Sequence, residues 1–268
     1  MNDHSPPPLT DDPAAIPRAI GMADFLAGPG PERAAVLADL DGCLISGATV
    51  LPGTAELLAR AGARLWIVSN NSSDTAQTLA VRLAALGLEV APQRILLAGE
   101  QAVRDMAAAQ PGARVALFAA PPLVALARTL GLEITRGEGA ADVALLARDP
   151  GFCMADLERL MRLVHRGVPL RLANPDPIHP AADGAPVPET GALFAALRAG
   201  LPELRAASGG KPSPALVMAA LARAGVAPAD AVFLGDTDAT DGAAARAAGV
   251  PFVLLRRPAP PIPTEPRP

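Results

Sequence analysis

The 268-residue chain contains no tyrosine, only two cysteines, no basic run and no apolar run of membrane-spanning length. Its net charge is −4, which argues against nucleic acid or an anionic membrane as the main partner. Cys43 and Cys153 are far apart in the sequence and lie outside any metal-type spacing. Without a signal peptide or a spanning segment, the expected location is the reducing cytoplasm.

What the chain has in abundance is apolar residues and proline. Hydrophobic residues make up 50% of the sequence and are spread over many short segments, a pattern typical of a globular α/β protein. Proline is concentrated near both ends, and we expect residues 1–20 and 257–268 to be disordered tails.

The most informative stretch begins at residue 34, where five small or apolar residues run into Asp39, Leu40, Asp41 and Gly42. Such a run predicts a buried parallel strand, and α/β sheets place their ligands at the carboxyl ends of these strands. Side chains two positions apart on a strand start on the same side, so Asp39 and Asp41 can act together. Two such acids can share a magnesium ion, or one can attack while the other transfers a proton. The alternative is a strand that ends in an ordinary polar turn.

Strand-type and helix-type segments alternate along the rest of the chain, which predicts a parallel-sheet α/β fold. The expected strands are 34–38, 65–68, 114–118, 142–146, 169–173, 231–234 and 252–255. The expected helices are 53–61, 74–86, 100–108, 121–130, 154–166, 190–198, 215–224 and 242–248. Residues 99–180 make up a compact α/β unit of their own. We expect this unit to be inserted into a core domain formed by residues 21–98 and 181–256.

The second expected strand is followed by a polar run that includes Ser69, Asn70 and Asn71. The run leads into a helix, and the free amides of a helix N-terminus suit an anion. Helix capping explains some of these residues, but it does not require five polar positions in a row. Phosphate binding is therefore favoured over capping alone.

A third apolar strand leads into Asp236 and Asp241, and Lys211 lies ahead of it in a glycine-flanked loop. In a parallel sheet these residues converge with Asp39 and Asp41. Four carboxylates cannot share a site in ionised form without a positive counterweight, which Lys211 and a magnesium ion would supply. We expect Asp236 and Asp241 to anchor the metal.

Together these groups suit phosphoryl transfer, which needs an in-line nucleophile and neutralisation of the phosphoryl oxygens. Asp39 can be the nucleophile and form an aspartyl-phosphate. Asp41 can protonate the leaving alkoxide and later take a proton from the attacking water. Lys211 with magnesium would hold the charge, while Ser69 and backbone amides would hold the phosphoryl oxygens.

Four motifs stand in order in the chain: Asp39-Leu40-Asp41-Gly42, Ser69-Asn70-Asn71, Lys211-Pro212 and the run from Gly235 to Asp241. They resemble the four ordered motifs of the haloacid dehalogenase-like (HAD) hydrolases. The insertion after the second motif is similar to the type IIA (C2a) cap of the NagD-like, phosphoglycolate phosphatase and pyridoxal phosphate phosphatase branch. The resemblance implies a Rossmann-like parallel-sheet core with an inserted α/β cap domain.

By this resemblance, magnesium is bound by the Asp39 side chain, the Asp41 backbone carbonyl and Asp236, with Asp241 in support. Asn174-Pro175-Asp176 resembles the return from cap to core, and His179 is placed like a substrate-loop histidine of the pyridoxal phosphate phosphatases. The residues expected to bind phosphate or substrate are therefore Ser69, Asn70, Asn71, Asn174, Asp176, His179 and Lys211.

Two features depart from the branch. Glu189 stands where a glycine is usual, and it could add a charge near the entrance of the site. Aromatic residues make up only 3% of the chain, which argues against a stacking platform for a pyridine ring or a nucleobase.

The sequence therefore predicts a magnesium-dependent phosphatase of small phosphorylated metabolites that acts through an aspartyl-phosphate. Sugar phosphates, glycerol phosphate, phosphoglycolate and pyridoxal phosphate all fit this prediction, and the branch suggests a homodimer through the cap. Two alternatives stay open. One is a phosphotransferase or mutase that passes the same phosphoryl group to another acceptor, and the other is a non-catalytic regulatory protein on this scaffold.

Overall fold

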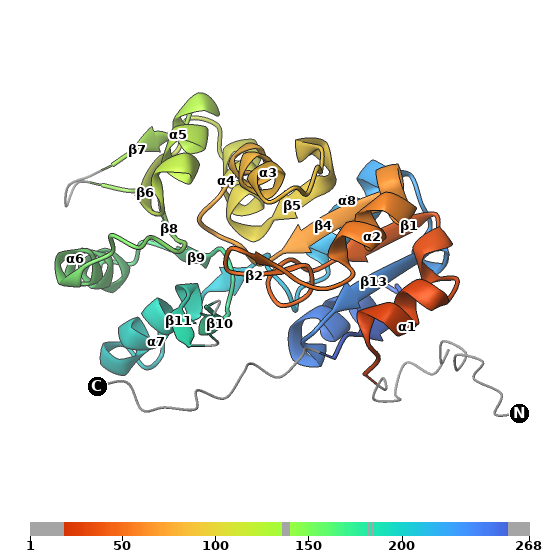
Figure 1. Ribbon diagram of the computed structural model, residues 1–268. Helices are drawn as coiled ribbons and strands as arrows, with labels where there is room; N and C mark the ends of the chain where they lie inside the picture. The colour runs from red at the N-terminus through yellow and green to blue at the C-terminus, as the bar shows by residue number, and fades with distance from the viewer. Residues whose placement is uncertain (1–18, 136–139, 182, 184, 257–268) are drawn as a thin grey trace, which may run out of the picture.

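The computed structural model of the chain describes residues 19–135, 140–181, 183 and 185–256. The tails expected at 1–20 and 257–268 lie outside these residues, apart from Ala19 and Ile20. Ile20 is not part of a free tail, because it pairs with Leu255 in a parallel bridge. Two five-stranded sheets lie on opposite sides of the molecule, and helices cover both of them (Figure 1).

The first sheet has the strand order β14-β13-β1-β4-β5, and all neighbours are parallel. Its strands are β1 (Ala35–Ala38), β4 (Leu65–Ser69), β5 (Ile95–Leu97), β13 (Ala231–Gly235) and β14 (Phe252–Leu254). Successive side chains of β1 point to opposite faces of the sheet. Val36 and Ala38 pack with α1 (Met22–Ala27), α2 (Thr54–Ala61) and α3 (Ala76–Ala85). Ala35 and Leu37 pack with α8 (Ala215–Ala224) and α9 (Ala243–Ala247).

The second sheet has the order β12-β9-β8-β6-β7 and is also parallel. Its strands are β6 (Arg114–Phe118), β7 (Glu133–Ile134), β8 (Val143–Leu146), β9 (Leu170–Leu172) and β12 (Ala207–Ser208). Apolar residues of α4 (Ala98–Ala109) and α5 (Pro121–Thr129) cover one face. Those of α6 (Met154–His165) and α7 (Thr190–Gly200) cover the other. The predicted parallel-sheet α/β fold is thus confirmed.

The structure differs from the expected segment boundary at residue 180. Residues 190–208 were expected in the core, but Leu193 and Leu197 of α7 pack with Leu160 and Leu170 of the second unit. β12 likewise pairs with β9 of the second sheet. The short strands β5, β7 and β12 were not predicted, because a segment of two or three residues is too short to show the alternating apolar pattern of a strand. The division into a core domain and a cap domain stays a prediction.

Two hairpins lie between the sheets. One joins β2 (Ile45–Ser46) to β3 (Thr49–Val50), within the non-helical stretch that follows Asp41. The other joins β10 (Ile178–Pro180) to β11 (Pro186–Pro188). The Ser46 hydroxyl donates a hydrogen bond of 3.5 Å to the carbonyl oxygen of Ala181, so the two hairpins meet.

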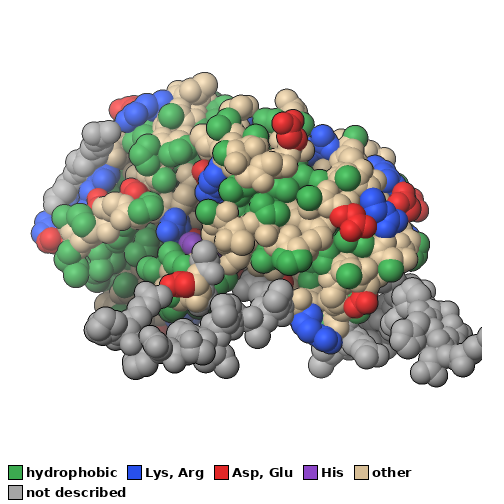
Figure 2. All heavy atoms as spheres, viewed as in Figure 1, with side chains coloured by type: hydrophobic (Ala, Val, Ile, Leu, Met, Phe, Trp, Pro, Cys, Tyr) green, Lys and Arg blue, Asp and Glu red, His purple; other side chains and the backbone are tan. Residues whose placement is uncertain are grey.

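The outside of the molecule has a mixed character. On the face seen in Figure 2, acidic and basic side chains are interspersed and neither sign gathers into a patch. Among the described residues, no helix combines the length and apolarity needed to cross a bilayer.

Candidate active site

The strand ends of the first sheet meet the hairpins at a cavity of about 490 Å³. Every predicted site residue except Asn174 lines this cavity. Those that do are Asp39, Asp41, Ser69, Asn70, Asn71, Asp176, His179, Lys211, Asp236 and Asp241. Residues from both halves of the chain therefore reach one place, as expected for the carboxyl edge of a parallel sheet.

Asp39 is held at the end of β1 by the sheet itself. Its backbone N–H continues the ladder by donating to the carbonyl oxygen of Leu234, at 2.8 Å. The chain then turns back at Gly42, whose φ of +85° lies in the left-handed region that favours glycine. The N–H of Gly42 donates to the carbonyl oxygen of Ile45 at 2.6 Å, which closes the turn into the β2–β3 hairpin. This turn fixes both acids of the first motif at the cavity.

Lys211 is the only lysine in the sequence, and it is almost completely buried, with 2% of its surface exposed. Its Nζ lies 2.6 Å from Asp39 Oδ1 and 2.7 Å from Asp241 Oδ1. It also donates to the carbonyl oxygen of Val68, the last but one residue of β4, at 3.0 Å. A buried ammonium is stable only when it is paired and hydrogen-bonded in this way.

Opposed electrostatic effects act on this pair. Burial disfavours the charge on Lys211, but Asp241 and Asp39 outweigh it and raise the pKa of the ammonium. For Asp39, burial raises the pKa well above its ordinary value, Lys211 opposes the rise, and Asp241 and Asp236 add to it. The site therefore carries more negative charge than one lysine neutralises.

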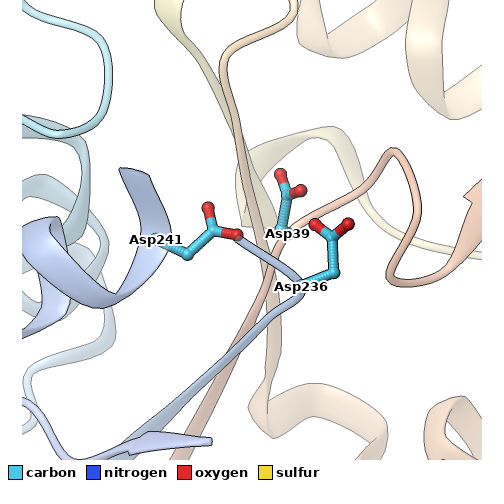
Figure 3. Close-up of side chains that lie close together, drawn as sticks. All are labelled: Asp39, Asp236 and Asp241. Atoms are coloured by element: carbon cyan, nitrogen blue, oxygen red, sulfur yellow. The ribbon is translucent and has the colours of Figure 1, made fainter. Parts of the chain in front are cut away.

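Asp39, Asp236 and Asp241 form a group that fits a metal ion. Each offers one carboxylate oxygen, and these oxygens lie within 4.8 Å of one another. Figure 3 shows the three carboxylates gathered together, with Asp39 and Asp236 just after β1 and β13 and Asp241 on the short helical segment that follows. Gly235 permits the approach, because a Cβ at this position would lie 2.4 Å from the Asp241 Cβ. Oxygen donors with excess negative charge suit a hard divalent cation such as Mg²⁺.

Asp41 lines the cavity next to this group and is only partly exposed. Burial raises the pKa of its carboxyl, while the nearby His179 and Arg82 oppose the rise. A carboxyl with a raised pKa keeps its proton more readily near neutral pH, which suits a group that must donate a proton.

Asn70, which was expected to bind substrate, lines the cavity, and its side-chain amide also holds the surrounding protein together. Its Oδ1 accepts from the N–H of Lys211 at 2.7 Å, and its Nδ2 donates to the Lys211 carbonyl oxygen at 2.9 Å. The same Nδ2 donates to Asp176 Oδ2 at 2.9 Å. Asn70 therefore fixes the lysine loop and the β9–β10 connection in one arrangement.

Asn71 shapes the polar run that follows β4. Its side-chain Oδ1 accepts from the N–H groups of Ser73 and Asp74, at 3.0 and 2.9 Å. Its own N–H donates to Ser69 Oγ at 3.1 Å. The helix that follows begins after Thr75, whose hydroxyl accepts from the N–H of Thr78. The polar run thus builds a tight turn beside the cavity, and Thr75 supplies the helix cap.

Asn174 is fully buried and does not line the cavity, so the structure does not support the expected contact with substrate. Its Nδ2 donates to the Asn70 carbonyl oxygen at 2.8 Å and to Ser72 Oγ at 3.0 Å. The Ser72 hydroxyl also lies 3.0 Å from Thr190 Oγ1 and accepts from the N–H of Arg148 at 3.1 Å. This buried network joins β4 to the ends of β8 and β9 and to α7.

Arg148 also lines the cavity and was not predicted from the sequence. Its Nε lies 3.4 Å from Glu189 Oε1, and the same oxygen lies 2.7 Å from His179 Nδ1. All three side chains line the cavity. The signal was available, because Arg148 comes just after the buried strand β8, the kind of position that drew attention to Asp39.

Two family models match the chain. A haloacid dehalogenase-like hydrolase model matches residues 36–133, and a HAD-hydrolase-like model matches residues 208–258. The first match runs into the central insertion and contains the first two predicted motifs, and the second match contains the other two.

Curated relatives cover most of the chain. Human chronophin is 34% identical over 223 residues, which are 77% of this chain and 75% of chronophin. D-glycerol 3-phosphate phosphatase of Mycobacterium tuberculosis is 29% identical over 226 residues, or 84% of this chain. The match spans only 63% of the mycobacterial protein's own length.

Solved structures share the fold. The crystal structure of the mycobacterial glycerol phosphate phosphatase in complex with magnesium superimposes with a TM-score of 0.76. That comparison has 28% sequence identity and covers 88% of this chain and 69% of the other. The chain belongs to the haloacid dehalogenase-like hydrolases, in the type IIA branch of that family.

Proposed function

We propose that the protein is a magnesium-dependent phosphatase that hydrolyses small phosphomonoesters through an aspartyl-phosphate on Asp39. The observation that carries the proposal is the position of Lys211 Nζ, 2.6 Å from Asp39 Oδ1 and 2.7 Å from Asp241 Oδ1. This arrangement holds one carboxylate at the floor of the cavity, with cationic charge beside it for the phosphoryl oxygens.

In the proposed first step, Asp39 attacks phosphorus in line with the leaving oxygen, and the oxygen–phosphorus bond to the alcohol breaks. Asp41, whose pKa is raised by burial, donates its proton to the leaving alkoxide. In the second step Asp41 takes a proton from water as the water attacks phosphorus, which releases inorganic phosphate and restores Asp39. Lys211 balances the charge of Asp39 and of the transferring group throughout.

Magnesium, held by Asp39, Asp236 and Asp241 with the Asp41 carbonyl, would neutralise phosphoryl oxygen charge when bound. The three carboxylates lie close together, and a single lysine does not neutralise all of their negative charge, so the group fits a divalent cation. Ser69 and the amides of the turn after β4 would complete the phosphate cradle.

The relatives support this reading. The mycobacterial relative is named for D-glycerol 3-phosphate, and a relative from Corynebacterium glutamicum, 25% identical, is named dihydroxyacetone phosphatase. Both names describe small phosphate esters, so we extend that substrate class to this chain. A homodimer through the cap and a location in the cytoplasm stay predictions.

The test is a phosphate-release assay over a panel of phosphomonoesters with magnesium, using Asp39→Asn as the inactive control. We expect turnover of at least one small ester, and a loss of at least about 10³-fold in the variant. Thermal unfolding and circular dichroism should show that the variant keeps its fold. Added acceptor alcohols that divert the phosphoryl group from water would indicate a phosphotransferase instead. Undiminished turnover by Asp39→Asn would remove the proposed mechanism.

A further inference from the structure

Three side chains of the second unit form a cluster at the cavity, which we call the distal cluster: Arg148, His179 and Glu189. Arg148 follows β8, His179 lies on β10, and Glu189 follows β11. None of them belongs to the four motifs that hold phosphate and metal. The cluster lines the same cavity as Asp39, so it faces the space open to the rest of a bound substrate.

Glu189 uses only one of its two carboxylate oxygens within the described chain. Oε1 lies 2.7 Å from His179 Nδ1 and 3.4 Å from Arg148 Nε. Oε2 is buried and has no hydrogen-bond partner among the described residues. The side chain as a whole is only 12% exposed. A buried carboxylate oxygen without a donor is costly, so a ligand that donates a hydrogen bond to it gains affinity.

Arg148 is fixed from two sides. Its Nε donates to the carbonyl oxygen of Pro188 at 3.2 Å, and its Nη1 donates to Ser73 Oγ at 3.3 Å. Within the described chain the other terminal nitrogen, Nη2, donates no hydrogen bond. The distal cluster thus combines an acceptor atom on Glu189 and a donor atom on Arg148 that have no hydrogen-bond partner within the described chain.

The charges around the cavity argue against a second anionic group on the substrate. Each lysine or arginine that lines the cavity, within the described residues, is paired with a carboxylate. The nitrogen–oxygen distances are 2.8 Å for Arg82–Asp74, 3.4 Å for Arg148–Glu189 and 2.6 Å for Lys211–Asp39. Among the described cavity residues, a carboxylate on the leaving group would therefore meet no lysine or arginine whose charge is not already balanced by a carboxylate.

We infer that Glu189 is a specificity-determining residue that selects phosphate esters of uncharged polyols over esters with an acidic leaving group. This inference rests on the proposed function, because it names the substrate class of the same site. A hydroxyl can donate to Glu189 Oε2 and accept from Arg148 at once. A carboxylate can only accept, and it would meet the charge of Glu189. An ammonium can only donate, and it would meet the charge of Arg148.

The experiment compares kcat/KM for glycerol 3-phosphate, phosphoglycolate and phosphoethanolamine. We expect the native protein to favour glycerol 3-phosphate over each of the other two by about tenfold or more. Glu189→Gln removes the charge at nearly constant volume, and it should lower the ratio of glycerol 3-phosphate to phosphoglycolate by about tenfold or more. The matched control is Glu203→Gln, at a glutamate whose side chain is 96% exposed, and it should leave the ratio unchanged.

Two results would overturn the inference. One is a native preference for phosphoglycolate, and the other is an equal loss on all three esters in Glu189→Gln, which would assign Glu189 to packing alone. The proposed function fails only if no ester of the wider panel is hydrolysed. If the native protein hydrolyses none of these three esters, calorimetric binding to Asp39→Asn with magnesium decides the inference separately. Tighter binding of glycerol 3-phosphate than of phosphoglycolate supports it, and equal or weaker binding contradicts it. The same titration decides the question if Glu189→Gln does not fold.

Discussion

Lys211 Nζ lies 2.6 Å from Asp39 Oδ1, although the two residues are 172 positions apart in the sequence. The same nitrogen contacts Asp241 Oδ1 and the Val68 carbonyl oxygen. One ammonium group therefore connects the end of β1, the end of β4 and the turn after β13. Because all these partners are buried, the contact ties the geometry of the site to the stability of the fold.

Lys211→Met should destabilise the metal-free protein. The change leaves Asp39 and Asp241 buried without their cation, and removing one partner of such an ion pair costs about 3–5 kcal/mol of unfolding free energy. Urea denaturation in the presence of a chelator measures the loss. Arg246→Met is the control, because Arg246 pairs with Asp238 at the surface and should cost about 1 kcal/mol or less. Equal effects of the two substitutions would contradict the structural role given to Lys211.

Asp236→Asn should weaken magnesium activation more than it affects folding. The substitution removes one charge from the group of three carboxylates. We expect the magnesium concentration for half-maximal activity to rise by at least about tenfold. Asp238→Asn makes the same chemical change two residues away, at a side chain that pairs with Arg246, and should leave that concentration unchanged. An unaltered magnesium dependence in Asp236→Asn would exclude Asp236 as a ligand.

Ser72→Ala should loosen the junction between the two sheets. The Ser72 hydroxyl contacts Asn174, Thr190 and the N–H of Arg148, and all of these lose a partner on substitution. The buried groups left unsatisfied should cost about 1–3 kcal/mol of unfolding free energy, measured by urea denaturation. Ser213→Ala, at a serine whose hydroxyl only accepts from the N–H of Ala215, should cost clearly less. A loss in Ser72→Ala no larger than in this control would show that the junction does not depend on Ser72.

Asp176→Asn should change how stability depends on pH. Burial raises the pKa of the Asp176 carboxyl, while the hydrogen bond from Asn70 opposes the rise. Folded Asp176 therefore holds its proton more tightly than unfolded Asp176. The contribution of Asp176 to the unfolding free energy therefore falls as pH rises from the ordinary aspartate pKa of about 3.9 through the raised value, and then levels.

The variant does not titrate at this position. Its stability relative to the native protein should therefore increase across that pH window, as followed by urea denaturation at several pH values. Asp39 and Asp41 titrate in both proteins, so their effects largely cancel in the difference. A difference that stays constant or falls with pH would contradict the raised pKa of Asp176.

Much of the site could be predicted because it follows from strand ends. Asp39 and Asp236 come directly after buried strands, and a parallel sheet brings such positions to one edge. The role of Lys211 could be predicted because a lysine in a glycine-flanked loop, close to several expected carboxylates, is suited to balance their charge. The α/β architecture followed from alternating apolar segments, whose period is a local property of the sequence.

Other features depend on pairing between distant segments, which a local pattern does not carry. The side chain of Asn174 was expected to contact substrate, but it is buried away from the cavity and donates to backbone and side chains that folding brings beside it. The bonds of Asn70 to Lys211 likewise join segments that are distant in the sequence. The Arg148–Glu189 pair joins residues that follow different strands, so it could be recognised only once the fold was known. The position of α7 could not be predicted either, because its apolar face could pack on either sheet. Only the structure shows that Leu197 packs on the second sheet.

The central claim is that Asp39 carries the phosphoryl group during turnover. Rapid acid quenching of the reaction with a phosphate-labelled ester, followed by peptide mass spectrometry, measures this directly. We expect one phosphoryl group on the peptide that contains Asp39, and no label on the same peptide of Asp39→Asn. Phosphate release without any labelled protein, or a label on another residue, would contradict it.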